Sequence, residues 1–248
     1  MGLEEGANTG RFFFCELEIA KRARDENWTR DELLLYLLHC RGYSHTRRAS
    51  LMGEKAALCR VGLTRSRWLT AKAQLERKGV VRTISAPGSK SPLTCVASAQ
   101  APYGSSLNGD GSARAIDGHR YQDLADRQLL KLPWALIDQS ADGLPTLAHL
   151  ESTGSILCLA SLYALSDESG TTSTLLAWVE GVAESYVVQL AEGVEEQLAV
   201  NADQLARSSA ELLDSGLVYA GVEGTGKRMA GRWQLHLCHP MGPARVAA

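Results

Sequence analysis

Residues 63–81 read LTRSRWLTAKAQLERKGVV, and this stretch decides the fold. Trp68, Ala71 and Leu75 recur at helical spacing, so one side of the segment is expected to pack against another helix. Gly79 is typical of the end of a helix, and the residues that follow, 80–84, are rich in β-branched side chains. The stretch therefore predicts a helix over residues 64–78 followed directly by a strand.

Two further helices are predicted before this one. Thr29-Arg30-Asp31-Glu32 has the form of a capping box, in which a Thr hydroxyl and a Glu carboxylate satisfy free backbone amides. The apolar run Leu33–Leu38 follows, and Arg41-Gly42 favours the end of this helix, because a cation and a glycine suit a helix C-terminus. A shorter helix is expected over residues 53–61, ending at Gly62.

Strands are expected on both sides of these helices. Alternation of apolar residues at Cys15, Leu17 and Ile19 favours a strand over residues 11–20. Downstream, residues 93–98 are typical of a strand that returns after a Gly-, Ser- and Pro-containing loop. The resulting order of helix, helix, short turn, helix and hairpin predicts a winged helix-turn-helix module.

The pattern of this module resembles that of bacterial winged-helix DNA-binding proteins. In that pattern an apolar residue and a Thr or Ser open the third helix, as Leu63-Thr64 does here. A second apolar residue, Trp68, follows four places later, and a Leu, a charged pair, a Gly and two aliphatic residues close the pattern at 75–81. The resemblance implies that helix 64–78 is a recognition helix, whose N-terminal residues enter the DNA major groove.

Two sets of DNA-contacting residues follow for the first half of the chain. Arg can donate two hydrogen bonds to guanine and Gln can pair with adenine; the predicted base contacts are Thr64, Arg65, Ser66, Arg67, Thr70 and Gln74. Cations around the helix could neutralise phosphates; the predicted phosphate contacts are Arg47, Arg48, Arg60, Arg77, Lys78, Arg82 and Lys90. A solvated charged surface without a ligand is the simpler alternative.

Charge is divided unevenly along the chain. The 248 residues carry 26 Lys and Arg against 28 Asp and Glu, a net charge of −2. Residues 1–98 contain 17 basic and 10 acidic residues, a net +7, whereas residues 99–248 contain 9 and 18, a net −9. A basic half favours an anionic partner, although two mutually attracting surfaces of one protein would give the same totals.

The Gly- and Ser-rich segment 99–119 falls at the change of sign, so we expect a flexible linker there between domains at 1–98 and 120–248.

The second half repeats the pattern of the first. Aligning Gly216 with Gly79 pairs five apolar positions of the two halves: Val200, Leu205, Leu212, Leu217 and Val218 with Leu63, Trp68, Leu75, Val80 and Val81. Asn201, a good N-cap residue, then lies opposite Thr64. A helix over 155–165 and strands over 217–220 and 232–237 complete the match, while strand and helix fit residues 173–198 equally well. The predicted fold class is α+β, with two winged helix-turn-helix domains in tandem, each a small helical bundle with a β-hairpin wing.

Two such modules in tandem resemble the replication initiators of bacterial plasmids and phages, in which both modules bind successive stretches of origin DNA. The second recognition helix departs from this pattern, because residues 201–209 carry one Arg and one Asp where the first copy has two Arg. Its wing still contains Lys227, Arg228 and Arg232 as predicted phosphate contacts. Alternatively, the acidic second domain is an interaction surface for a homodimer or for other subunits of a nucleoprotein complex.

Other kinds of site have weaker support. Residues 221–228 nearly match a phosphate-binding loop, but Arg228 replaces the Ser or Thr that ligates magnesium, and strand alternation follows where a helix is required. His236, Cys238 and His239 lie close together, yet the alternation from Trp233 onward favours a strand over a metal site. We therefore expect no enzyme activity, no catalytic residues, no metal, no cofactor and no small-molecule substrate.

Three features of the sequence bear on where the protein is located. The six cysteines are scattered, the N-terminus lacks the features of a signal peptide, and the longest uncharged stretch, 152–166, is too short to span a bilayer. These features predict a cytoplasmic protein without membrane contact. The expected function is sequence-specific binding of double-stranded DNA in replication initiation or transcriptional regulation on a bacterial mobile element. The alternative is a winged-helix interaction subunit of a larger nucleoprotein complex.

Overall fold

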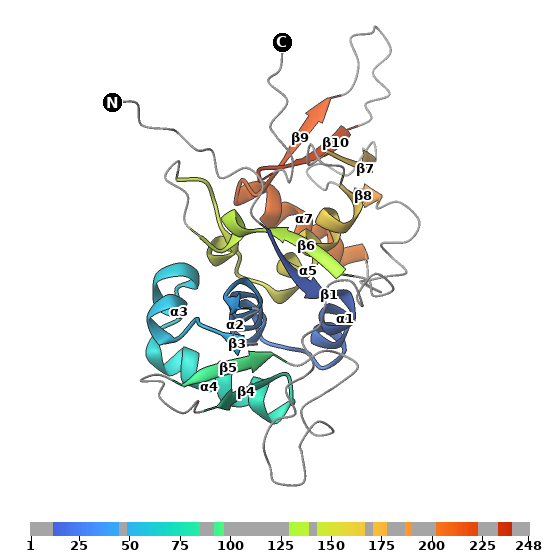
Figure 1. Ribbon diagram of the computed structural model, residues 1–248. Coiled ribbons are helices and arrows are strands. Elements are labelled where there is room, and N and C mark those ends of the chain that lie inside the picture. Colours follow the sequence, from blue (N-terminus) through green and yellow to red (C-terminus); the bar gives the residue numbers. More distant parts are fainter. Residues whose placement is uncertain are drawn as a thin grey trace, which may run out of the picture. The chain divides into compact units, whose positions relative to one another are not determined.

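A computed structural model of the chain is shown in Figure 1. It describes residues 12–44, 49–84, 92–96, 129–138, 143–166, 171–177, 187–189, 202–222 and 233–239. The chain divides into two compact units, residues 13–130 and residues 131–248 together with 1–12, which we call the N-terminal and C-terminal units. The predicted linker 99–119 lies outside the described residues. Both units combine helices with an antiparallel sheet, so the predicted α+β class is confirmed.

Four helices form in the N-terminal unit: α1 (Leu17–Asp25), α2 (Arg30–Arg41), α3 (Glu54–Val61) and α4 (Arg65–Arg77). The capping box before α2 is confirmed, since Thr29 Oγ1 accepts from the Glu32 amide at 3.3 Å and the Thr29 amide donates to Glu32 Oε2 at 2.7 Å. Gly62 ends α3 with a φ of 69°, a left-handed conformation that only glycine adopts without strain.

The N-terminal sheet is built from short antiparallel strands in the order β2-β3-β5-β4. These are β2 (Tyr43–Ser44), β3 (Ala49–Ser50), β4 (Val81–Ile84) and β5 (Leu93–Val96). The predicted hairpin is confirmed, with register from Val81 opposite Val96 to Ile84 opposite Leu93. β2 and β3 were not predicted.

The strand predicted over residues 11–20 was only partly right. β1 (Phe12–Glu16) ends where α1 begins, and Ile19 and Ala23, four residues apart, are buried on one side of that helix. The alternation at residues 15, 17 and 19 is too short to distinguish the two-residue period of a strand from the 3.6-residue period of a helix. The structure forms a helix from Leu17 onward.

The core of the N-terminal unit surrounds α2. All of Leu33 to His39 is buried, because α3, α4, β3 and β5 each contact this helix. On α4, Ala71 and Leu75 are buried, and Leu63 just before the helix is fully buried. The predicted packing of one side of α4 against α2 is therefore confirmed.

The C-terminal unit contains α5 (Thr153–Leu165) and α7 (Ala202–Asp214), which pack on each other, and the 3-10 turns η2 (Trp134–Leu136) and η3 (Leu147–His149). Its strands are β7 (Thr171–Ala177), β8 (Val187–Gln189), β9 (Val218–Val222), β10 (Trp233–Leu237) and the last three residues of β6 (Leu129–Pro133). Four of them form an antiparallel sheet in the order β8-β7-β10-β9. The predicted helix over 155–165 and the hairpin of β9 and β10 are confirmed.

The two units share the order of three sheet strands. In each, a strand that follows the first matched helix pairs with the second strand of a hairpin, giving β3-β5-β4 in one unit and β7-β10-β9 in the other. Gly79 and Gly216, the two glycines of the sequence alignment, have φ values of 68° and 73°. Buried side chains also lie opposite one another in that alignment: Ala71 and Ser208, Leu75 and Leu212, Val80 and Leu217, Val81 and Val218. Asn201, the predicted N-cap of α7, lies outside the described residues.

All six cysteines are free thiols. In the part of the chain that the structure describes, no helix combines the length and the apolar content needed to cross a bilayer.

Candidate nucleic-acid interface

α4 presents one exposed side along its whole length. Ala71 and Leu75 bury the opposite side. The exposed side, which we call the α4 face, consists of Arg65, Ser66, Leu69, Thr70, Ala73, Glu76 and Arg77. Arg67 is exposed too and lies at the edge of this face, toward α2. A helix with one buried and one continuous exposed side can be inserted into a groove without disturbing its own core.

The predicted base-contact residues lie together at the start and middle of α4. Thr64 is the N-cap, with its Oγ1 3.4 Å from Ser66 Oγ, and both residues are exposed together with Arg65, Arg67 and Thr70. Gln74 differs from the others, because it is half-buried and faces the α2 side of the helix. The structure thus brings the predicted set together on one element.

Arg65 is the more exposed of the two arginines in the first turn of α4. Its side chain is 77% exposed, and its nearest carboxylate is Glu54 of α3, with Nη1 3.8 Å from Oε1. Exposed pairs of this kind contribute little, typically about 0–1 kcal/mol. The Arg65 guanidinium can therefore leave Glu54 for a stronger anionic partner at small cost.

Arg67 is held much more firmly. Its Nε donates to Asp31 Oδ2 at 2.7 Å and its Nη2 donates to Asp31 Oδ1 at 2.5 Å, so two parallel bonds join α4 to the first turn of α2. Hydrogen bonding to Asp31 raises the pKa of Arg67, which keeps this side chain charged. Parallel charge-assisted bonds of this type fix the plane of a guanidinium as well as its position.

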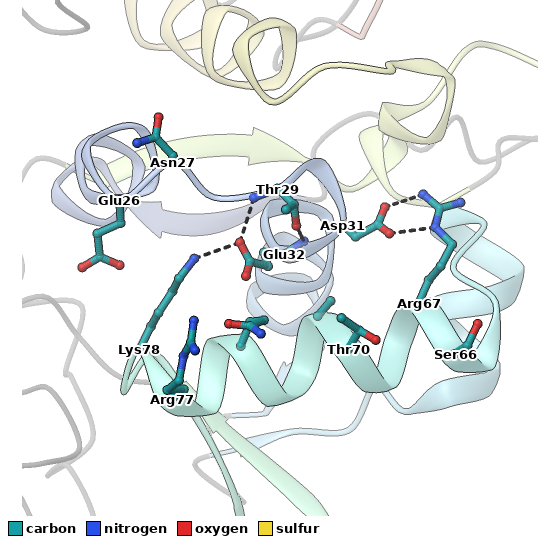
Figure 2. A pocket seen from close by; sticks show the side chains of 12 residues that line it. Glu26, Asn27, Thr29, Asp31, Glu32, Ser66, Arg67, Thr70, Arg77 and Lys78 are labelled. Carbon is teal, nitrogen blue, oxygen red and sulfur yellow. Dashed lines mark hydrogen bonds and ion pairs between the residues drawn. The ribbon is translucent and has the colours of Figure 1, made fainter.

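An open groove of about 540 Å³ runs between α4 and the N-terminal end of α2 (Figure 2). Its polar lining residues come from the α1–α2 connection, from α2 and from α4: Glu26, Asn27, Thr29, Asp31, Glu32, Ser66, Arg67, Thr70, Gln74, Arg77 and Lys78. Each carboxylate in the lining has a basic partner: Arg22 for Glu26, Arg67 for Asp31 and Lys78 for Glu32. The groove is therefore polar without a large excess of either charge.

Lys78, a predicted phosphate contact, has partners inside the unit. Its Nζ lies 2.9 Å from Glu32 Oε2 and 5.2 Å from the centre of the Trp28 ring. The Lys78 and Glu32 side chains are only 16% and 4% exposed. The ammonium thus compensates a buried carboxylate and is turned away from the α4 face.

The other predicted phosphate contacts fall into three groups. Arg77 is exposed at the end of α4 and has no carboxylate partner among the described residues. Arg60 and Arg82 are half-buried and have partners of their own. Arg47, Arg48, Lys90, Lys227, Arg228 and Arg232 lie outside the described residues.

α7 uses the corresponding positions differently. In the alignment of Gly216 with Gly79, Ala202, Gln204 and Asp214 replace Arg65, Arg67 and Arg77. The counterpart of Gln74 is Glu211, which satisfies the N-terminus of α5: it accepts from the Ser152 amide at 3.2 Å, from Ser152 Oγ at 2.9 Å, from Ser155 Oγ at 2.5 Å and from the Glu151 amide. Burial alone would raise the pKa of Glu211, but these hydrogen bonds outweigh it and lower that pKa.

Behind the α4 face lies a buried polar cluster that the sequence did not indicate. Neither ring nitrogen of His39 on α2 has a hydrogen-bond partner among the described residues, and the same holds for Trp68 Nε1 on α4. Burial, reinforced by nearby Lys72, lowers the pKa of His39 to about 3. The Lys72 ammonium lies 5.3 Å from the centre of the Trp68 ring. His39 is therefore held neutral in the folded protein.

Other candidate chemistry has little support in the described residues. Nowhere among them do three His, Cys, Asp or Glu side chains gather as metal ligands. His239 instead places Nε2 2.7 Å from the Pro145 carbonyl oxygen, and burial raises the pKa of Cys238 to about 12. Most of the near-match to a phosphate-binding loop, residues 223–228, lies outside the described part of the chain.

Comparison with protein-family models, with curated proteins and with solved structures finds no match. The geometry of α4 and its surroundings is therefore the basis for inferring a function. That geometry combines an exposed helix face, two differently held arginines and a polar groove alongside.

Proposed function

We propose that the chain is a sequence-specific double-stranded DNA-binding protein built from two winged helix-turn-helix modules, and that α4 is its recognition helix. One observation carries the proposal. The α4 face is exposed from the first turn to the last and bears two cations, Arg65 and Arg77, and one carboxylate, Glu76. Ala71 and Leu75 anchor the other side of the helix on α2. An α-helix fits the major groove of B-DNA, which is about 12 Å wide.

The surrounding topology supports the same proposal. α3 and α4 are separated by a tight turn at Gly62, and the hairpin β4–β5 follows α4 directly. In a winged helix the first of these helices crosses the DNA backbone, the second enters the groove, and the hairpin contacts flanking phosphates. The repetition of the strand order in the C-terminal unit supports a tandem arrangement.

Charge favours the N-terminal unit as the DNA-reading one. Residues 1–98 carry a net +7, which would steer the protein toward a polyanion. At the matched positions of α7 the cations are replaced by Ala202, Gln204 and Asp214. We therefore assign base recognition to α4 and a smaller or indirect part to α7. Replication initiation at an origin and transcriptional regulation at a promoter both require this step, recognition of a duplex site.

The proposal is tested by measuring how the affinity of the full chain for duplex DNA depends on salt. Fluorescence anisotropy with a labelled random-sequence duplex gives the slope of log Kd against log salt concentration, to which each phosphate contact contributes about 0.9. Arg77→Ala is expected to reduce this slope by about 1, and Arg65→Ala to weaken binding.

Arg24→Ala is the matched control, since it removes one cation from α1, where Arg24 is paired with Asp25. Its slope is expected to equal that of the unchanged protein. Absence of duplex binding at low salt, or equal losses in Arg24→Ala and Arg77→Ala, would refute the proposal.

A second candidate function for the C-terminal unit is protein interaction. It is favoured by the loss of all three cations at the positions of α7 that match Arg65, Arg67 and Arg77, with Asp214 in place of the last. In that case the unit joins two copies of the chain or binds another subunit. Sedimentation velocity of the full chain over a range of concentrations checks the first possibility, with a concentration-dependent dimer as the supporting result.

A further inference from the structure

Arg67 reaches Asp31 with only one edge of its guanidinium group. Nε and Nη2 form this edge, and they donate to the two carboxylate oxygens at 2.7 and 2.5 Å. A guanidinium has five N–H groups, so three of them are not used by Asp31. Two of those three, one on each Nη, form the end-on edge, which can make a second pair of parallel bonds.

The Arg67 side chain remains partly exposed beside Asp31. The Arg67 side chain is 46% exposed, although Asp31 is only 21% exposed. Figure 2 shows the pair at one end of the groove, with Ser66 and Thr70 nearby on α4. Arg67 thus has a fixed orientation and a free bidentate edge at the start of the helix that is proposed to enter DNA.

Arg65 lacks this combination. It is 77% exposed, and its 3.8 Å contact with Glu54 joins single atoms instead of two parallel pairs. Ordering a long side chain on binding costs about 0.5–1.5 kcal/mol. Arg65 incurs that cost when it contacts DNA, whereas Asp31 has already ordered Arg67 in the free protein.

We propose that Asp31 is a positioning residue for base recognition, which holds one edge of Arg67 so that the opposite edge reads a guanine. The inference rests on the proposed function, because it presupposes that α4 enters the major groove. The end-on edge of Arg matches O6 and N7 of guanine, and no other base pair presents two acceptors at these places. Asp31 does not repel the DNA strongly, since Arg67 neutralises it and Arg30 lies 3.4 Å away.

A purely structural role is the competing explanation. Asp31 lies in the first turn of α2, where a carboxylate is stabilised by the helix dipole. In that case replacing Asp31 would lower the melting temperature and weaken binding to all sequences alike. Positioning of Arg67 instead affects the preference at one base pair.

The test is selection of bound duplexes from a random pool by the full chain and by four variants: Asp31→Asn, Asp31→Glu, Arg67→Ala and the control Arg24→Ala. The unchanged protein is expected to select a motif in which one position favours guanine roughly tenfold or more. Arg67→Ala removes that preference, and Asp31→Asn reduces it at least about threefold while the other positions of the motif are retained. Asp31→Glu, which keeps a carboxylate, retains part of the preference, and the control Arg24→Ala leaves it unchanged.

Two failures are distinguishable. If the unchanged protein enriches no sequence, the proposed function fails and the role of Asp31 fails with it. If the protein selects a motif that Asp31→Asn reproduces in full, the proposed function stands and the role of Asp31 is wrong. Melting temperatures of the same proteins identify any variant that has lost its fold. If Asp31→Asn is such a variant, Asp31→Glu decides, because a guanine preference at least threefold below that of Arg24→Ala would contradict positioning by a carboxylate.

Discussion

Acidification is expected to destabilise the N-terminal unit through His39. Burial lowers the pKa of this side chain from 6.5 to about 3, with a smaller effect from Lys72. The unfolded chain binds a proton near pH 6.5 and the folded chain does not, so stability is fully present above pH 6.5 and is lost as the pH falls toward 3. At pH 5 the linkage relation gives a loss of about 2 kcal/mol relative to pH 7.5.

The substitution that isolates this effect is His39→Leu. At pH 7.5 it is expected to change the free energy of unfolding by less than about 1 kcal/mol, because neither ring nitrogen has a partner to lose among the described residues. Between pH 7.5 and pH 5, the free energy of unfolding of the variant is expected to rise by about 2 kcal/mol relative to that of the unchanged protein.

Urea unfolding of both full-length proteins at the two pH values, followed by tryptophan fluorescence, gives the comparison. Trp28 and Trp68 report on the N-terminal unit, and a Trp28→Phe variant identifies its transition. Subtracting the unfolding free energies of the two proteins at each pH removes the contribution of all other titrating groups, which both proteins share. Equal losses of stability in both proteins between pH 7.5 and pH 5 would refute the reasoning.

Three further substitutions test the internal contacts. Lys78→Met leaves the Glu32 carboxylate, which is 4% exposed, without its cation, and is expected to destabilise the unit by about 2–4 kcal/mol in urea unfolding while leaving the salt slope of DNA binding unchanged. Glu211→Ala removes the acceptor at the start of α5 and is expected to cost about 1–2 kcal/mol at neutral pH. The pKa of Glu211 is lowered in the folded state, so this cost should disappear as the pH falls through that pKa and the unchanged protein loses the same bonds. Gly79→Ala forces alanine to a φ of 68° and should lower stability by about 1 kcal/mol, measured by thermal unfolding.

Local signals allowed much of the N-terminal fold to be predicted. The capping box at Thr29 and the glycines at 62 and 79 act within a few residues of themselves, so their effect does not depend on the rest of the chain. The same holds for the burial of Ala71 and Leu75, which follows from helical periodicity.

Elements that depend on distant partners were missed. β2 and β3 are each two residues long, which is too short to show an alternation of apolar and polar residues. β3 forms because it pairs with β5, where Ser50 lies opposite Thr94. α1 was not predicted, because the apolar residues at positions 15, 17 and 19 alternate as they would in a strand. Contacts with residues that are distant in the sequence determine these elements, and the local residue pattern does not indicate those contacts.

The candidate site divides in the same way. The exposed residues of α4 were predictable because a helix places every third or fourth residue on the same side. The partners of those residues were not: the Asp31–Arg67 and Glu32–Lys78 pairs depend on how α4 crosses α2. Opposite charges in the first turn of α2 and along α4 are the signal that could have indicated these pairs. Lys78 was predicted as a phosphate contact, and its pairing with Glu32 was not predicted.

Contact between the α4 face and DNA is the central claim, and photocrosslinking tests it most directly. Ala73 on α4 and Ala210 on α7 are both exposed alanines at matched positions of the two units, so each can carry the same photoreactive side chain in the full-length protein. With a labelled duplex selected by the unchanged protein, irradiation is expected to attach DNA at position 73 in clear excess over position 210. Attachment at position 73 that is no greater than at position 210 would contradict the account.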